Sequence, residues 1–130
     1  MILLDTHVVI WLVSDPSQLS FRARAAIDDA RKKGEGLAIS DITLLELSTL
    51  VNKGRLHLSF SLESFLEEVE ARFVVLPITG RACVLAVGLP PTYPKDPADR
   101  VIAGTALAGG LPLLTADREI RRSKALHTIW

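Results

Sequence analysis

Four acidic residues stand where the surrounding sequence is apolar or where a strand is expected to end: Asp5, Glu46, Asp99 and Asp117. An isolated ionised carboxylate is costly to bury, because its lost hydration must be replaced by a counter-charge or by several hydrogen bonds. No Lys or Arg lies within two residues of Asp5 or Glu46. A bound cation is the simplest local compensation, so the pattern indicates an acidic metal pocket.

A hard divalent cation suits such a group of carboxylates. Two carboxylates about 4 Å apart repel by roughly 1 kcal/mol in water and by about 4 kcal/mol at an effective dielectric near 20. Mg²⁺ or Mn²⁺ offsets this repulsion, prefers oxygen ligands and leaves positions for water and phosphate. Such an ion can generate a hydroxide nucleophile and stabilise the charge that grows on an attacked phosphate.

Each of the four acids also has a simpler interpretation on its own. Glu46 lies in an apolar helical stripe between Ile42 and Leu50, and it could reach solvent or a distant Arg. Asp99 is expected at the third position of a helix, where an acid suits the positive helix end. Asp5 and Asp117 could be plain helix caps. The case for chemistry therefore depends on the four acting together.

Apolar segments alternate with helical segments along the chain. Strands are expected over residues 2–4, 37–39, 73–78, 111–115 and 127–130, and helices after Thr6, Ser20, Asp41, Ser61, Thr79 and Asp96 and at Asp117. Alternation of this kind predicts an α/β fold, a three-layer α/β/α sandwich with a mainly parallel central sheet of four to five strands. Ligands bind such sheets outside the carboxyl ends of the strands, and Asp5 and Asp117 fall at or just past two of those ends.

Composition limits the classes of protein that fit. The 130 residues are 48% hydrophobic, which predicts one domain over residues 1–130. Fifteen basic and fifteen acidic residues give a formal charge of +0, so no global field would attract nucleic acid. Cys83 is the only cysteine, no signal peptide is expected, and no apolar run approaches a membrane span, so a cytoplasmic protein without a membrane partner is predicted.

Four segments, in this order, resemble the signature segments of PIN-domain ribonucleases, most closely the toxin subunits of bacterial and archaeal VapBC-type toxin–antitoxin pairs. They are Leu3-Leu4-Asp5-Thr6-His7, Ser40-Asp41-Ile42-Thr43-Leu44-Leu45-Glu46-Leu47, Asp96-Pro97-Ala98-Asp99-Arg100 and Leu113-Leu114-Thr115-Ala116-Asp117-Arg118. The resemblance covers essentially the whole chain. It implies Mg²⁺- or Mn²⁺-dependent endonucleolytic cleavage of RNA by a homodimer, held inactive by a cognate antitoxin protein.

The same resemblance implies roles for individual residues. Asp5 and Asp99 would be the principal metal ligands, Asp117 would complete the ligand set or hold a second ion, and Glu46 would ligate through water or orient the attacking water. Thr115 looks like the family's hydroxyl near the site. Supporting positions are expected for Asp96, which is also assigned as a helix N-cap, and for Thr6.

Several residues near these acids also have expected roles. Arg100 and Arg118 could bind phosphate, although a solvated helix face is the more ordinary explanation of such charges. His7 is expected to be a partly buried helix residue. Trp11 is expected to pack in the core or at a subunit face rather than to stack on bases. The three histidines and Cys83 form no zinc-ligand spacing.

Two other functions stay open at this point. An Asp-based phosphotransfer domain has a similar layered build, but it usually needs a second acid at the first strand or a lysine after a late strand, and neither is present here. A non-catalytic binding module with the PIN fold would be favoured by a lost carboxylate, and none of the four is missing. Which RNA is cut depends on loop shape that no motif encodes.

Overall fold

The centre of the molecule is a sheet of five strands in the order β3-β2-β1-β4-β5, and every neighbouring pair is parallel. In the computed structural model, which describes residues 1–130, β1 pairs with β2 through Leu3 and Ala38 and with β4 through Leu4 and Leu114. The first strand therefore lies in the middle of the sheet. The strands are β1 Ile2–Leu4, β2 Leu37–Ser40, β3 Val74–Leu76, β4 Leu113–Leu114 and β5 Thr128–Ile129.

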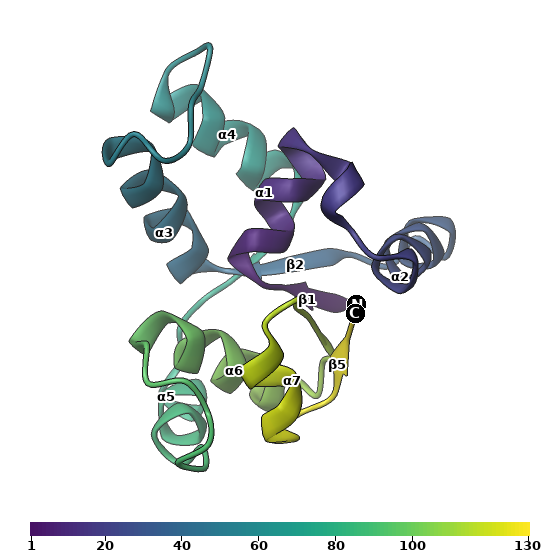
Figure 1. Cartoon of the computed structure of the whole chain (residues 1–130), viewed down its shortest axis with the longest axis vertical. Coiled ribbons are helices and arrows are strands. Elements are labelled where there is room, and N and C mark those ends of the chain that lie inside the picture. The colour runs from purple at the N-terminus through teal and green to yellow at the C-terminus, as the bar shows by residue number, and fades with distance from the viewer.

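Helices cover both faces of this sheet (Figure 1). Figure 1 shows α1, α3 and α4 on one side and α5, α6 and α7 on the other. The helices are α1 Thr6–Ser14, α2 Phe21–Lys32, α3 Asp41–Asn52, α4 Leu62–Arg72, α5 Gly80–Val87, α6 Pro97–Gly109 and α7 Arg118–Ser123, with a 3-10 turn, η1, over Pro16–Gln18. The predicted three-layer α/β/α sandwich with a parallel sheet is confirmed.

Two apolar cores form because successive side chains of a strand point to opposite faces of the sheet. Ile2 and Leu4 of β1 belong to the core beneath α1, α2, α3 and α4. Leu3 belongs to the second core, with Ile102 and Ala103 of α6. All three side chains of β1 are thus buried, and the strand ends at the site where Asp5 begins the next helix.

α5 and α6 pack unusually closely at Gly104. A Cβ atom at this position would lie 2.2 Å from the backbone oxygen of Ala82 in α5, and 3.1 Å from the Ala86 Cβ. Only glycine permits this approach without a shift of backbone. The contact fixes the position of α6, whose first turn carries Asp99.

The side chains that begin the helices are largely those expected from the sequence. Ser20, Ser61, Asp96 and Asp117 each accept backbone hydrogen bonds as N-caps. Thr6 was expected to cap the first helix, and that prediction is wrong. Asp5 is extended (φ −67°, ψ 153°) and accepts from the Thr6 backbone N–H at 2.9 Å, so that Thr6 becomes the first helical residue.

Three strands are shorter than the apolar runs that predicted them. The run over residues 73–78 forms a strand only over Val74–Leu76, and the last two predicted strands contain two residues each. Proline supplies no backbone N–H for a ladder. Pro77 directly follows β3 and Pro112 directly precedes β4, so these prolines limit the pairing.

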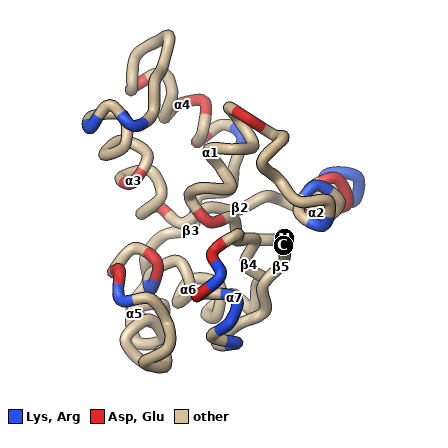
Figure 2. The backbone as a smooth tube through the Cα atoms, viewed as in Figure 1, with Lys and Arg blue, Asp and Glu red and all other residues tan.

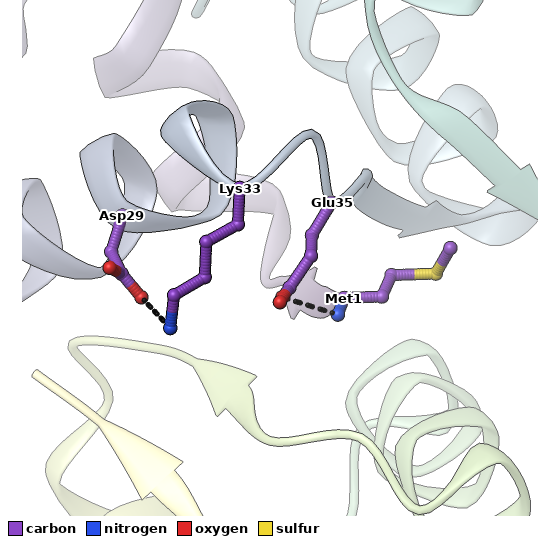
Figure 3. Close-up of polar contacts among 4 residues, drawn as sticks. All are labelled: Met1, Asp29, Lys33 and Glu35. Atoms are coloured by element: carbon purple, nitrogen blue, oxygen red, sulfur yellow. Dashed lines mark hydrogen bonds and ion pairs between the residues drawn. The ribbon is translucent and has the colours of Figure 1, made fainter.

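The basic and acidic side chains are mostly unpaired. Lys and Arg positions are prominent on α2 and α7 (Figure 2). The two ion pairs of the structure join the Met1 ammonium to Glu35 at 3.1 Å and Lys33 to Asp29 at 3.0 Å (Figure 3). Both are exposed pairs of the kind that contributes little to stability. Neither includes any of the four predicted site acids.

No helix combines the length and the apolar character needed to cross a membrane.

Candidate functional site

All four predicted acids line one pocket of about 350 Å³. Asp5 follows β1, Glu46 lies in α3, Asp99 is in the first turn of α6, and Asp117 begins α7. In Figure 2, acidic positions mark the starts of α1, α6 and α7. The pocket is lined by Asp5, Thr6, His7, Trp11, Glu46, Asp96, Asp99, Ala116 and Asp117.

Asp5 is the most enclosed of the acids, with 7% of its surface exposed. Its Oδ1 accepts from the Thr6 backbone N–H at 2.9 Å, and its Oδ2 accepts from the Thr115 hydroxyl at 2.8 Å. Burial raises the pKa of Asp5, and the hydrogen bonds from Thr115 and Thr6 oppose that rise. Each carboxylate oxygen can accept more than one bond, so the fixed carboxylate can still bind a further group.

Glu46 is held by a short chain of hydroxyl groups. The Thr6 hydroxyl donates to Glu46 Oε1 at 2.5 Å and lies 3.0 Å from the Thr43 hydroxyl. Because the single Thr6 proton goes to Glu46, the Thr43 hydroxyl donates to Thr6. Burial is the main cause that raises the pKa of Glu46, and the negative charges of Asp5 and Asp96 add to it.

Asp99 has the most perturbed carboxyl group of the pocket. Its pKa is raised from 3.8 to about 7, chiefly by burial and also by the negative charges of Asp5, Asp96, Glu46 and Asp117. Asp96, not Asp99, caps α6: its Oδ1 accepts from the Ala98 N–H at 2.8 Å and from the Asp99 N–H at 3.5 Å. The Asp99 side chain is therefore not needed as the cap of this helix.

Asp117 is the N-cap of α7 and also lines the pocket. Its Oδ1 accepts from the backbone N–H groups of Glu119 at 2.8 Å and Ile120 at 3.1 Å. Its own N–H donates to the Thr115 hydroxyl oxygen at 3.1 Å. Thr115 thus connects Asp5 and Asp117, as expected for a hydroxyl near the site.

Comparison with known proteins decides the family. The family model of the PIN domain matches residues 2–126. The chain belongs to the PIN-domain family. It is 36% identical to "Ribonuclease VapC22" of Mycobacterium tuberculosis over 131 residues, which covers 99% of this chain and 98% of that relative.

Solved structures show the same fold. The crystal structure of VapBC2 from Rickettsia felis bound to a promoter DNA fragment contains a chain that matches with a TM-score of 0.74 at 20% identity, covering 98% of this chain and 97% of that chain. DNA-bound VapBC from Salmonella typhimurium matches with a TM-score of 0.69 at 25% identity, covering 98% and 97%. The predicted PIN-like fold is confirmed.

The donor chemistry of the pocket in this PIN domain fits a hard divalent cation. Three carboxyl groups have raised pKa values, partly through mutual repulsion, and no Lys or Arg forms an ion pair with any of them. The side chains are spread around the pocket wall, however, and no three His, Cys, Asp or Glu groups are close enough to hold an ion together. Metal ligation by Asp5, Asp99 and Asp117 therefore stays a prediction.

The structure gives Arg100 a different role from the phosphate binding considered for it. Its guanidinium donates to the backbone oxygens of Pro94 at 3.0 Å, Tyr93 at 3.2 Å and Ala86 at 3.3 Å. All three nitrogens are used to hold the loop before α6 against the end of α5. Arg118, exposed at the start of α7, stays the phosphate candidate of the pair.

Three residues at the site were missed or misjudged from the sequence. Thr43 supports Thr6 and received no role, although it lies three residues before Glu46 and hence on the same face of α3. His7 was expected to be partly buried but is exposed at the pocket. Trp11 packs against the core as expected but also lines the pocket. The four-residue spacing of His7 and Trp11 is the signal that places both on one face of α1.

Proposed function

We propose that this PIN domain is a metal-dependent endoribonuclease that hydrolyses RNA phosphodiester bonds and serves as the toxin of a toxin–antitoxin pair. The observation that carries this proposal is the single pocket whose wall contains four carboxylates, none of them in an ion pair with a basic side chain. The name of the relative that is 36% identical, a ribonuclease, supports the reaction class. The solved VapBC structures support a cognate antitoxin as partner.

Mg²⁺ or Mn²⁺, when bound, would supply a water of lowered pKa and stabilise charge on the attacked phosphate. Asp5 and Asp99 would be its principal ligands, with Asp117 completing the set. Asp5 is already oriented by Thr6 and Thr115. Its position beyond the central strand gives this ligand the most rigid support in the pocket.

Glu46 is suited to accept a proton from the attacking water. Its Oε1 is held by the Thr6 hydroxyl, which leaves Oε2 for the water. A general base works best when its pKa lies near the working pH, and burial moves the Glu46 pKa upward in that direction. Thr6 and Thr43 act as positioning residues for this carboxylate.

A homodimer in the cytoplasm is part of the same proposal. Apolar side chains are exposed on α5 and α3, where Val84 is 63%, Val87 81% and Leu45 62% exposed. Large exposed apolar side chains of this kind favour burial against another protein surface. Size measurement in solution, by light scattering at several protein concentrations, tests the dimer.

Cleavage assays with matched variants test the enzymatic proposal. Purified protein free of antitoxin is incubated with structured RNAs in Mn²⁺, Mg²⁺ or a chelator, alongside Asp5→Asn, Asp99→Asn and Asp28→Asn variants. We expect internal cuts that need the metal, a loss of at least about 100-fold in the two pocket variants, and no loss in Asp28→Asn, which changes an exposed acid of α2.

Two outcomes would remove the proposal. Cutting that persists in the chelator would exclude the metal, and wild-type rates in both pocket variants would exclude the carboxylates. Calorimetric titration with Mn²⁺ gives a second readout that does not depend on turnover. A folded wild-type protein that binds RNA and never cuts it would indicate the non-catalytic binding module.

A further inference from the structure

Three ring side chains extend from the acidic pocket along the surface. His7 and Trp11 lie one turn apart on α1, with ring centroids 6.1 Å apart and planes inclined by 54°. Trp130, directly after β5, also packs against Trp11, with ring centroids 5.7 Å apart and planes inclined by 48°. We call His7, Trp11 and Trp130 the ring row. Two of its members line the acidic pocket.

The far end of the ring row borders a second pocket of opposite charge. This pocket, also of about 350 Å³, is lined by Arg22, Arg121, His127, Thr128, Ile129 and Trp130. Arg22 comes from α2 and Arg121 from α7, and neither takes part in an ion pair. Basic positions of α2 and α7 flank β5 in Figure 2. Trp130 lines this basic pocket and contacts Trp11, so the row connects the two pockets.

The two tryptophans are anchored and yet accessible. Both pack against the core beneath α1 to α4, and both keep part of their surface exposed. A half-buried indole holds its orientation at little entropic cost while it offers a face or edge to a ligand. Single-stranded nucleic acid supplies the matching groups, because its bases stack on aromatic rings and its phosphates bind arginine.

We infer that the ring row and the basic pocket form the path of single-stranded RNA to the acidic pocket, with bases stacking on Trp11 and Trp130 and a phosphate bound by Arg22 and Arg121. This inference rests on the proposed ribonuclease function and adds a substrate form and a direction. A neutral protein can bind a polyanion in this way, because the basic groups are concentrated at one end of the path. Duplex RNA fits poorly, since its bases are already stacked on each other.

Intrinsic fluorescence provides a direct test, because the chain contains two tryptophans and both belong to the ring row. A single-stranded RNA of about ten nucleotides is titrated into the whole protein in the presence of a chelator, which prevents metal-dependent cutting. We expect saturable quenching that weakens with added salt, and much weaker quenching by a duplex of the same sequence. Unchanged emission overturns the inference, whether or not anisotropy detects bound RNA.

Variants on the same helices separate the basic pocket from general charge. We expect Arg22→Ala and Arg121→Ala to raise the Kd for this RNA roughly tenfold and to lower the slope of log Kd against log salt by about one. Arg31→Ala on α2 and Arg122→Ala on α7 remove the same charge outside the basic pocket, and a change of less than about twofold is expected. An equal change of Kd in all four variants would contradict the assignment of the phosphate to the basic pocket.

A second pair of variants tests stacking independently of packing. Trp130→Leu keeps an apolar side chain and is expected to weaken RNA binding by roughly tenfold, whereas Trp130→Phe keeps a ring and most of the affinity. Thermal unfolding of both variants checks that they fold. Equal affinity in Trp130→Leu and Trp130→Phe would overturn the stacking part.

Separate measurement of KM and kcat distinguishes this inference from the ribonuclease proposal. In Mg²⁺, we expect Trp130→Leu and Arg121→Ala to raise KM about tenfold with kcat nearly unchanged, since neither residue touches the acidic pocket. If the ribonuclease proposal fails, the wild-type protein does not cut RNA, while the fluorescence titration still reports binding. If only the path fails, the wild type cuts RNA and both variants keep its KM.

Discussion

The Thr115 hydroxyl connects two of the four pocket acids at the ends of neighbouring strands. It is fully buried, donates to Asp5 Oδ2 at 2.8 Å and accepts from the Asp117 N–H at 3.1 Å. A hydroxyl that uses both its donor and an acceptor site allows little rotation. Thr115 therefore orients the Asp5 carboxylate and resists the rise in its pKa that burial causes.

Replacing Thr115 by valine tests this orientation. Thr115→Val preserves the shape of the side chain but removes the donor to Asp5, so that the pKa of Asp5 rises further and the carboxylate can turn. Partners that orient metal ligands typically contribute 10- to 100-fold to affinity or activity, and we expect kcat/KM for RNA to fall by about that factor.

The matched control is Thr105→Val. The Thr105 hydroxyl donates to the Val101 oxygen within α6 and does not line the pocket. We expect this variant to keep the wild-type rate. A Thr115→Val protein as active as Thr105→Val would show that the hydroxyl has no part in orienting Asp5.

For single residues, the sequence indicated which charged side chains matter more clearly than it indicated which groups they bind. A carboxylate in an apolar stripe, such as Glu46, is conspicuous because burying it is costly. Asp5, Asp99 and Asp117 could each be explained as an acid at the start of a helix, and they pointed to a site only as a set. Arg100 shows the limit. Its charge is visible in the sequence, but its guanidinium binds two carbonyls of the loop before α6 and one of α5, and the sequence does not specify the path of that loop. Trp11 is similar, since an indole on a helix fits both a core and a pocket wall.

Among the elements, α6 is positioned by its contact with α5 as well as by its packing against the sheet. Gly104 brings the two helices so close that no side chain fits between them. The first turn of α6 carries Asp96 and Asp99, and Arg100 holds the preceding loop against the end of α5. α5 therefore supports the pocket without contributing a residue to it.

Gly104→Ala tests that support. The new Cβ would lie 2.2 Å from the Ala82 oxygen, so α5 and α6 must move apart. Overpacking of this kind typically costs about 1 to 3 kcal/mol, and we expect a clear drop in the thermal unfolding midpoint together with reduced cleavage. Gly80→Ala, at the start of α5 with no atom within 4 Å of the new Cβ, is the control. Equal midpoints in the two variants would contradict the close contact.

Most elements could be predicted because their boundary residues have one strong preference. Ser20, Ser61 and Asp96 begin helices where expected, since their side chains accept the free backbone N–H groups of a first turn. Strand lengths were less predictable. An apolar run has the same sequence pattern whether or not its backbone pairs with another strand. Pro77 and Pro112 limit the pairing of β3 and β4.

Over the whole molecule, a formal charge of +0 conceals an uneven distribution. The acids of the pocket repel one another, and burial together with this repulsion raises the pKa of Asp99 from 3.8 to about 7. Between these two pH values the folded state binds more protons than the unfolded chain, so the contribution of Asp99 to stability is fully present below pH 3.8 and is lost as the pH rises to about 7. Asp5 and Glu46 shift in the same direction.

The thermal unfolding midpoint should fall as the pocket acids ionise. We expect a midpoint several degrees lower at pH 8 than at pH 5, because a change of about 1 kcal/mol moves the midpoint of a protein of this size by roughly 4 °C. Millimolar Mg²⁺ should raise the midpoint more at pH 8 than at pH 5, since a cation binds the ionised pocket. Calorimetry of the wild type and of Asp99→Asn measures both effects.

Asp99→Asn removes the group with the largest perturbation, so both the pH dependence and the Mg²⁺ effect should shrink in it. A wild-type midpoint that rises from pH 5 to pH 8, or an Mg²⁺ effect of the same size in the variant, would contradict this account of the pocket.

The central place of β1 makes the pocket depend on a pairing between distant parts of the chain. β1 pairs with β2 on one side and with β4, which lies far along the chain, on the other. Asp117 follows β4, so the four acids can line one pocket only after this long-range pairing has formed. A folding intermediate without β4 would leave β1 as an open sheet edge and would hold Asp5 without Asp117 beside it.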